Sequence, residues 1–156
     1  MVVGIEKEAN SRRGRFIRYA PFLVWTAIIF LASSSTGSAT NTSRFIRPLL
    51  EFIFFSASGE FIDTIHFLIR KSAHFIFYGI LAVLAMRAFV GSRKALLASR
   101  PAATALVATL LIASLDELNQ SMNPDRTGSP SDVLLDLSGG AVFLIVFFLL
   151  RRLIAR

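Results

Sequence analysis

The stretch VLLDLSGGAVFLIVFFLL, residues 133–150, decides the fold class of this chain, because Asp136 is its only charged residue. A hydrophobic stretch of about 18 residues or more with so few charges is the pattern of a transmembrane helix. Three more apolar runs lie upstream, at Tyr19–Ala32, Ser72–Val90 and Ala102–Leu115. The first and third reach a spanning length only when polar neighbours are included. Together the four runs predict an all-α protein, a four-helix transmembrane bundle.

The composition supports a membrane protein. The chain has 156 residues, of which 54% are hydrophobic and 17% are charged. Ordinary soluble domains carry roughly 25% charged residues, and one of this size buries only about 70% of the surface of its unfolded chain. These values disfavour a water-soluble enzyme and a disordered protein. The absence of cysteine excludes disulfides, thiolate metal sites and thiol nucleophiles.

The basic residues predict the orientation. Most of the 17 Lys and Arg residues lie before the first run, between the second and third, and after the fourth. Cytoplasmic segments next to spans carry such an excess. We therefore expect a multi-pass protein of the cytoplasmic (inner) membrane with both termini in the cytoplasm. The expected parts are a basic N-terminus at residues 1–18, a membrane domain at 19–150 and a basic tail at 151–156.

The net charge of +7 is then explained by topology and by contact with anionic membrane lipids, and we expect no nucleic-acid partner. One alternative stays open for the first run. Its basic flank, its short apolar stretch and the small residues Ala32-Ser33-Ser34 also fit a cleavable signal peptide. Cleavage would leave three spans and would not change the orientation of the rest.

A long outer connection, Ser33 to Lys71, separates the first two runs. Its first residues are rich in Ser, Thr and Gly, which is typical of an irregular segment. From about Gly59 onward the apolar residues recur at helical spacing and share one face, while charged residues take the other. This pattern predicts an amphipathic helix on the outer membrane surface, between the first and second spans. Its apolar face comprises Phe61, Ile62, Ile65, Leu68 and Ile69.

Polar residues gather at the outer ends of all four runs. They are Ser33 after the first, Lys71, His74 and Tyr78 in the second, Asp116, Glu117 and Gln120 at the end of the third, Arg126 in the connection that follows, and Asp132 and Asp136 at the start of the fourth. An ionised side chain in hydrocarbon costs at least about 2.5–3.5 kcal/mol. His74 and Asp136, which lie inside runs, should therefore face the interior of the bundle, where one polar site would form.

Simpler interpretations of single residues stay open. Asp132 can stabilise the start of the fourth helix, as acidic residues there commonly do. Lys71 and Arg126 can bind lipid phosphate alone. The shared location of the whole set is what favours a functional site over these separate roles.

The same residues resemble the signature of VanZ-like membrane proteins, from about Pro21 to Leu150. The resemblance implies an envelope protein of bacteria, because the family is named for a protein associated with resistance to the glycopeptide teicoplanin. An antibiotic-resistance role is thus an expectation from the family. The matching motifs are Lys71-x-x-His74-Phe75-x-x-Tyr78-Gly79, Ser114-Leu115-Asp116-Glu117-x-x-Gln120, Pro124-x-Arg126-x-Gly128 and Ser131-Asp132-Val133-x-x-Asp136-x-x-Gly139.

Three functions stay open on the sequence. The first is binding of a lipid head group, a lipid-linked envelope precursor or a glycopeptide, through Lys71, Tyr78, Gln120, Arg126, Asp136 and Ser33. The second is an extracytoplasmic hydrolase or transferase, with catalytic candidates His74, Asp116, Glu117 and Asp132 acting as acid and base or holding a divalent metal. The third is a small ion-coupled transporter, for which a homodimer could supply a second half.

Overall fold

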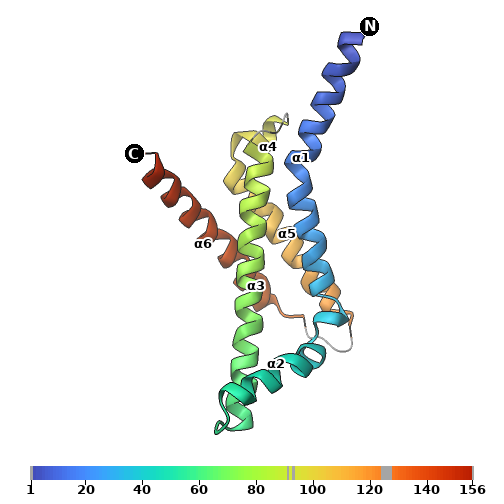
Figure 1. The fold of residues 1–156 in the computed structure, drawn as a ribbon. Helices are drawn as coiled ribbons and strands as arrows, with labels where there is room; N and C mark the ends of the chain where they lie inside the picture. The colour runs from blue at the N-terminus through green and yellow to red at the C-terminus, as the bar shows by residue number, and fades with distance from the viewer. Residues whose placement is uncertain (1, 91, 93, 124–127, 156) are drawn as a thin grey trace.

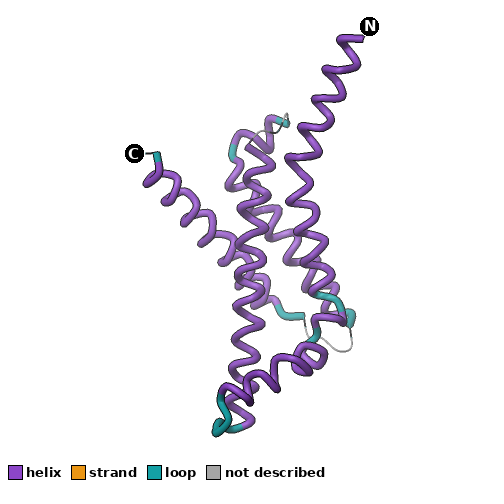
Figure 2. Tube along the Cα trace, viewed as in Figure 1, coloured by secondary structure: helices purple, strands orange, loops and turns teal. Residues whose placement is uncertain are grey.

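The structure is a computed structural model and describes residues 2–90, 92, 94–123 and 128–155. This part of the chain is all-α and contains no strand, as the sequence predicts. Short loops join the helices (Figure 2). The elements are α1 (Val2–Ala32), the 3-10 turn η1 (Ser35–Gly37), α2 (Ala39–Ile53), α3 (Gly59–Val90), α4 (Ala95–Ser99), α5 (Pro101–Ser121) and α6 (Pro130–Ile154).

Three of the described helices, α3, α5 and α6, are long and apolar enough to cross a membrane. The apolar part of α1 is shorter and covers Phe16–Ala32. The chain is thus a helical membrane protein with three candidate spans, and the fourth span expected at α1 depends on this shorter stretch. Helix α1 also includes residues 2–18, which the charge pattern alone assigns to a separate N-terminal segment.

Helix α3 is the centre of the molecule, because it packs against α6, α5 and α1 (Figure 1). Two glycines allow α3 and α6 to lie close together. A Cβ on Gly139 would lie 2.2 Å from the carbonyl oxygen of Phe75, and one on Gly79 would lie 2.5 Å from the ring of Phe143. Small residues at such contacts are common between membrane helices, because they let the backbones approach.

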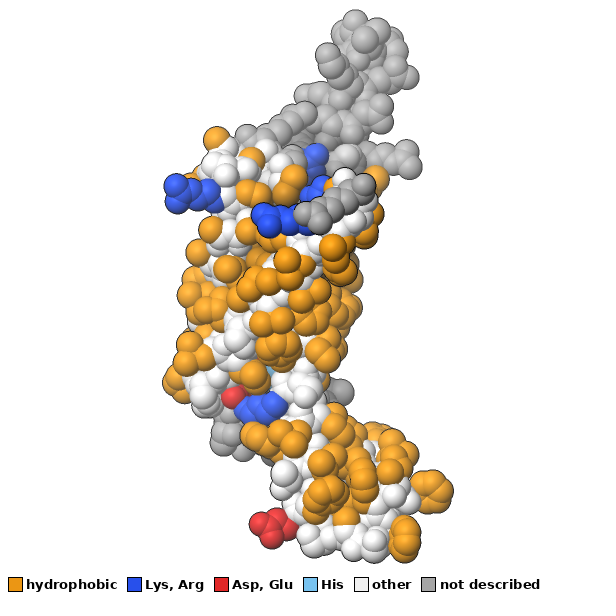
Figure 3. Space-filling view, turned by 90° about the vertical axis from the view of Figure 1, so that its left-hand side faces the viewer, with side chains coloured by type: hydrophobic (Ala, Val, Ile, Leu, Met, Phe, Trp, Pro, Cys, Tyr) orange, Lys and Arg blue, Asp and Glu red, His pale blue; other side chains and the backbone are white. Residues whose placement is uncertain are grey.

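The two ends of the molecule differ. The chain termini and α4 lie toward one end, while α2 runs across the other (Figure 1). Figure 3 shows Lys and Arg side chains gathered near the terminal end of the face it displays, with hydrophobic side chains over the middle. Large apolar side chains such as Leu111 on α5 and Leu149 on α6 are more than half exposed. This is the surface expected of a protein surrounded by lipid acyl chains.

The predicted surface helix near Gly59–Lys71 does not exist as a separate element. This segment is the first half of α3, which continues without interruption to Val90. Contact with α2 explains part of its amphipathic pattern, since Ile62 is 1% exposed and His66 is buried on the side that meets α2. The Nε2 atom of His66 lies 3.2 Å from Oγ1 of Thr42 on α2. Packing against α2 accounts for Ile62, whereas Phe61, Leu68 and Ile69 on the same apolar face are 40–50% exposed.

Helix α2 occupies the place between the first two spans where a surface helix was expected. Ser38 caps it by accepting a hydrogen bond from the Asn41 backbone at 3.2 Å. Large apolar side chains, among them Phe45 and Phe52, are more than 80% exposed on it. Much of the connection expected to be irregular, residues 33–41, is therefore ordered as η1 and the start of α2.

Candidate functional site

The predicted polar residues meet where the end of α5, the start of α6, the middle of α3 and the end of α1 come together. The buried members are Ser33, Tyr78, Asp116, Glu117, Gln120 and Asp136. Ser33 directly follows the end of α1, and the other five residues lie on α3, α5 and α6. The candidate Arg126 lies outside the described residues.

Asp116 is the centre of the first of two groups within the site. Its carboxylate is fully buried, and its Oδ2 atom accepts three hydrogen bonds from three helices or their ends. The donors are Ser33 Oγ at 2.7 Å, Tyr78 Oη at 3.0 Å and Gln120 Nε2 at 3.0 Å. Because the three donors lie at the end of α1, on α3 and on α5, these hydrogen bonds tie the ends of α1 and α5 to α3.

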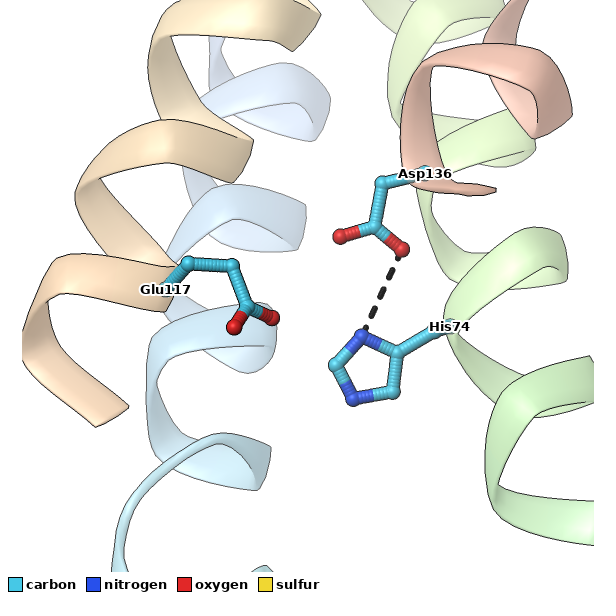
Figure 4. A group of neighbouring side chains, drawn as sticks. All are labelled: His74, Glu117 and Asp136. Carbon is cyan, nitrogen blue, oxygen red and sulfur yellow. Dashed lines mark ion pairs between the residues drawn. The ribbon is translucent and has the colours of Figure 1, made fainter. Parts of the chain in front are cut away.

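His74, Glu117 and Asp136 form the second group, and they come from α3, α5 and α6 respectively (Figure 4). One ligand atom from each lies within 4.8 Å of the others. Nδ1 of His74 is 3.4 Å from Oδ1 of Asp136, and the Glu117 carboxylate points toward the same ring in Figure 4. The sequence predicts that these residues lie together, but it does not separate them from the Asp116 group.

The connection between α5 and α6 orients Glu117. The Ser129 backbone N–H donates a 2.7 Å hydrogen bond to its Oε2 atom. Gly128 allows this approach, because a Cβ there would lie 2.4 Å from the Glu117 carbonyl oxygen. The other carboxylate oxygen, Oε1, has no hydrogen-bond partner in the described part of the chain.

Several buried polar atoms of the site are without a hydrogen bond among the residues that the structure describes. They are His74 Nδ1, Asp116 Oδ1, Glu117 Oε1 and both carboxylate oxygens of Asp136. Burying a polar group without a partner costs free energy, and native structures contain few such atoms. Water molecules, an ion or a polar ligand at this place would satisfy these atoms.

Asp132 and Lys71 lie next to this cluster and form an ion pair with each other across α6 and α3. Their side chains are 16% and 30% exposed. Asp132 is in the first turn of α6, as its interpretation as a helix-start residue expects, and the N-cap itself is Ser129. Because Lys71 already neutralises it, Asp132 is a weaker catalytic candidate than His74, Glu117 or Asp136.

A cavity of about 280 Å³ lies beside the site, between α1, α2 and α3. Much of its wall is apolar, including Ile29, Ile69 and Phe77. Ser33, His74 and Tyr78 also line it, so the cavity and the polar cluster share residues.

Arg70 is the one functional candidate at this cavity that sequence reasoning missed. It lines the wall, and its Nη1 donates to Gly37 O at 2.8 Å and to Thr42 Oγ1 at 3.2 Å. Its position four residues before His74, and so on the same helix face, was the available signal. The surface-helix interpretation placed Arg70 on a solvated face instead.

Comparison with known proteins agrees with the resemblance seen in the motifs. No curated protein and no solved structure matches the chain. Residues 16–151 match the VanZ/LLP1 family. This match includes all the residues of the two polar groups and the three candidate spans except the last turn of α6. The protein therefore belongs to the VanZ/LLP1 family of membrane proteins.

Proposed function

We propose that this protein binds the anionic head group of a membrane lipid or lipid-linked envelope molecule in the cavity between α1, α2 and α3. The observation that carries the proposal is the position of Arg70. It lines an otherwise largely apolar cavity, and among the described residues its Nη1 atom donates to two neutral oxygens, Gly37 O and Thr42 Oγ1. A half-buried cation whose hydrogen bonds go to neutral oxygens favours an anionic ligand, and guanidinium groups bind phosphate well.

The size and lining of the cavity support the same ligand class. Small-molecule pockets begin at roughly 300 Å³, so a volume of about 280 Å³ accommodates a head group or one segment of an acyl chain. Apolar side chains from α1 and α3 would contact the chain, while Arg70, Ser33 and His74 would contact the polar part. A ligand with both parts is an amphiphile such as a phospholipid or a polyprenyl phosphate.

Native mass spectrometry of the purified protein tests this proposal. The protein is mixed with equal amounts of phosphatidylglycerol, a polyprenyl phosphate and phosphatidylcholine, and the retained lipid is counted. We expect both anionic lipids to be retained over the zwitterionic lipid, and Arg70→Gln to reduce retention about tenfold, the loss of roughly one charge-assisted contact. The ratio of the two anionic lipids identifies the source of the head group.

Arg47→Gln is the matched control for Arg70→Gln. Arg47 is also an arginine on the α2–α3 pair, but it is 43% exposed and is already paired with Glu51 and Asp63. This variant should retain the same lipids as the parent protein. Equal retention of all three lipids, or equal loss in both arginine variants, would refute the proposal.

A lipid-linked ligand of this kind also suggests which side of the membrane the cavity faces. With the basic ends of the helices in the cytoplasm, the cavity would face the cell envelope of a bacterium, where lipid-linked precursors and glycopeptides are found. Teicoplanin resistance would then arise from altered exposure of such a precursor. Expression of the protein in a sensitive host should raise the inhibitory concentration of teicoplanin, and Arg70→Gln should abolish that increase.

An enzyme that acts on the bound amphiphile is the second candidate function. The observation in its favour is that His74 lies in the cavity wall and beside Asp136, which is the arrangement of a general base with an orienting carboxylate. In such a reaction His74 would accept the proton of an attacking water or hydroxyl. Mass spectrometry of the lipids after incubation tests this candidate: an enzyme forms a product that His74→Ala abolishes, whereas a protein that only binds lipid forms no product.

A further inference from the structure

We infer that His74, Glu117 and Asp136 form a binding site for a divalent transition-metal ion of the Zn²⁺ or Mn²⁺ class. The inference is independent of the lipid proposal, because metal binding is measured without lipid. It goes beyond the general expectation of a metal near the polar residues, since it selects three of the candidate ligands and excludes others.

The unpartnered atoms of these three side chains point to the ligand. Asp136 has no exposed surface, and neither of its carboxylate oxygens has a hydrogen-bond partner among the described residues. Glu117 is 6% exposed, with Oε1 likewise unpartnered in that part of the chain. Two ionised carboxylates buried at one place repel each other, and a cation bound between them would offset that repulsion. One histidine nearby supplies at most one positive charge.

The distances fit a metal better than a hydrogen bond. Nδ1 of His74 lies 3.4 Å from Oδ1 of Asp136 without the alignment of a hydrogen bond. Two ligands about 2.1 Å from a tetrahedral zinc ion are separated by roughly 3.4 Å. The full set lies within 4.8 Å, so small side-chain rotations would bring the third ligand atom to that separation.

The ligand types select the class of ion. Imidazole favours zinc and other transition metals, whereas sites made only of oxygen ligands favour magnesium or calcium. One imidazole with two carboxylates fits Zn²⁺ or Mn²⁺. Three protein ligands leave at least one coordination position for water or another molecule, and His74 also lines the cavity.

The neighbouring acidic residues are excluded on the geometry. Asp132 is already paired with Lys71. Asp116 is not a member of the three-residue group, and its Oδ2 atom accepts three hydrogen bonds. Asp116 and its donors therefore hold the end of α5 in place, which positions the adjacent Glu117.

The test is isothermal titration of the full-length, chelator-treated protein with ZnCl₂ and with MnCl₂, followed by elemental analysis of the dialysed protein. We expect one ion per chain for at least one of the two metals. Loss of a partner that only orients a metal ligand weakens binding roughly 10–100-fold, so Asp136→Asn and Glu117→Gln, which each remove a direct ligand, should weaken it at least tenfold. Asp63→Asn, an exposed carboxylate on the same protein (64% exposed), should bind as the parent protein does.

Thermal unfolding keeps the test decisive if a variant is destabilised. A bound ion stabilises the folded state, so the same metal concentration should raise the melting temperature of the parent and of Asp63→Asn more than that of Asp136→Asn or His74→Ala. Failure of both metals to bind the parent protein overturns the inference. So does binding that is equal in Asp136→Asn and the parent. Lipid retention that persists after chelation would leave the proposed function intact in either case.

Discussion

His74 on α3 and Asp136 on α6 face each other, with Nδ1 and Oδ1 3.4 Å apart. They meet because Gly139, one turn after Asp136, lets α6 approach the backbone carbonyl of Phe75, the residue next to His74. The close helix contact and the polar pair are therefore one feature. Packing that brings the two helices together also fixes the spacing of the two side chains.

A larger residue at position 139 should disrupt both the close contact between α3 and α6 and the spacing of His74 and Asp136. In Gly139→Ala the added Cβ would lie 2.2 Å from Phe75 O, a backbone atom that cannot rotate away. Overpacking costs typically about 1–3 kcal/mol, so the variant should unfold at a lower temperature and bind metal more weakly. Circular dichroism during heating measures the first effect. Gly14→Ala is the control, since a Cβ added there would meet nothing within 4 Å, and equal stability of the two variants would contradict this account.

The hydrogen bonds to Asp116 should be measurable one at a time. Ser33→Ala and Tyr78→Phe each remove one donor to Oδ2 and should lower the free energy of unfolding by about 1–2 kcal/mol. Because both donors share one acceptor oxygen, the double variant should differ from the sum of the two. Unfolding in mixed micelles gives all three values. Ser138→Ala, whose hydroxyl bonds only within its own helix, should change the value little.

Because Lys71 and Asp132 form an ion pair, removing the charge of Asp132 should restore stability that is lost when the charge of Lys71 is removed. Lys71→Gln leaves the mostly buried Asp132 carboxylate without its cation, which should cost about 1–2 kcal/mol, below the range for fully buried pairs because both side chains are partly exposed. Asp132→Asn in the Lys71→Gln background should restore most of that loss. A double-mutant cycle on the free energy of unfolding supplies the measurement. Additive effects would show that the pair contributes nothing.

The orientation can be tested directly, because the chain contains no cysteine. Glu51 on α2 and Lys94 near α4 are exposed at opposite ends of the molecule. A membrane-impermeant maleimide added to intact cells should label Glu51→Cys and should label Lys94→Cys only after permeabilisation. The reverse pattern would show that the basic ends of the helices face the cell exterior.

Hydropathy and charge placement were sufficient to predict a helical membrane protein and to predict that polar residues of separate helices lie together. The high cost of a charge in hydrocarbon requires residues such as Asp136 to turn inward, and the structure buries it completely. Family motifs added that the polar residues of separate helices belong together. These predictions did not require a structure, because the rules on hydropathy, charge placement and charge burial apply to single helices and their ends.

The sequence could not predict that the site divides into two groups, one around Asp116 and the other formed by His74, Glu117 and Asp136. Asp116 and Glu117 are neighbours, and successive side chains on a helix point about 100° apart. Which one meets Ser33 and which one meets His74 depends on how α1, α3 and α6 are rotated around α5. The continuity of α3 was missed for a related reason: the periodic pattern at its start is the same whether the partner surface is lipid or α2.

The length of α3 has a consequence for how a ligand could arrive. Its 32 residues extend about 48 Å at 1.5 Å per residue, and even a tilt of 40° leaves a projected height of roughly 37 Å against a hydrocarbon core of about 30 Å. At least one end of α3 must then extend past the acyl chains, and we expect it to be the first turns, against which α2 packs. The cavity between α2 and α3 would then open at the membrane–water interface, where an amphiphile can enter laterally without leaving the bilayer.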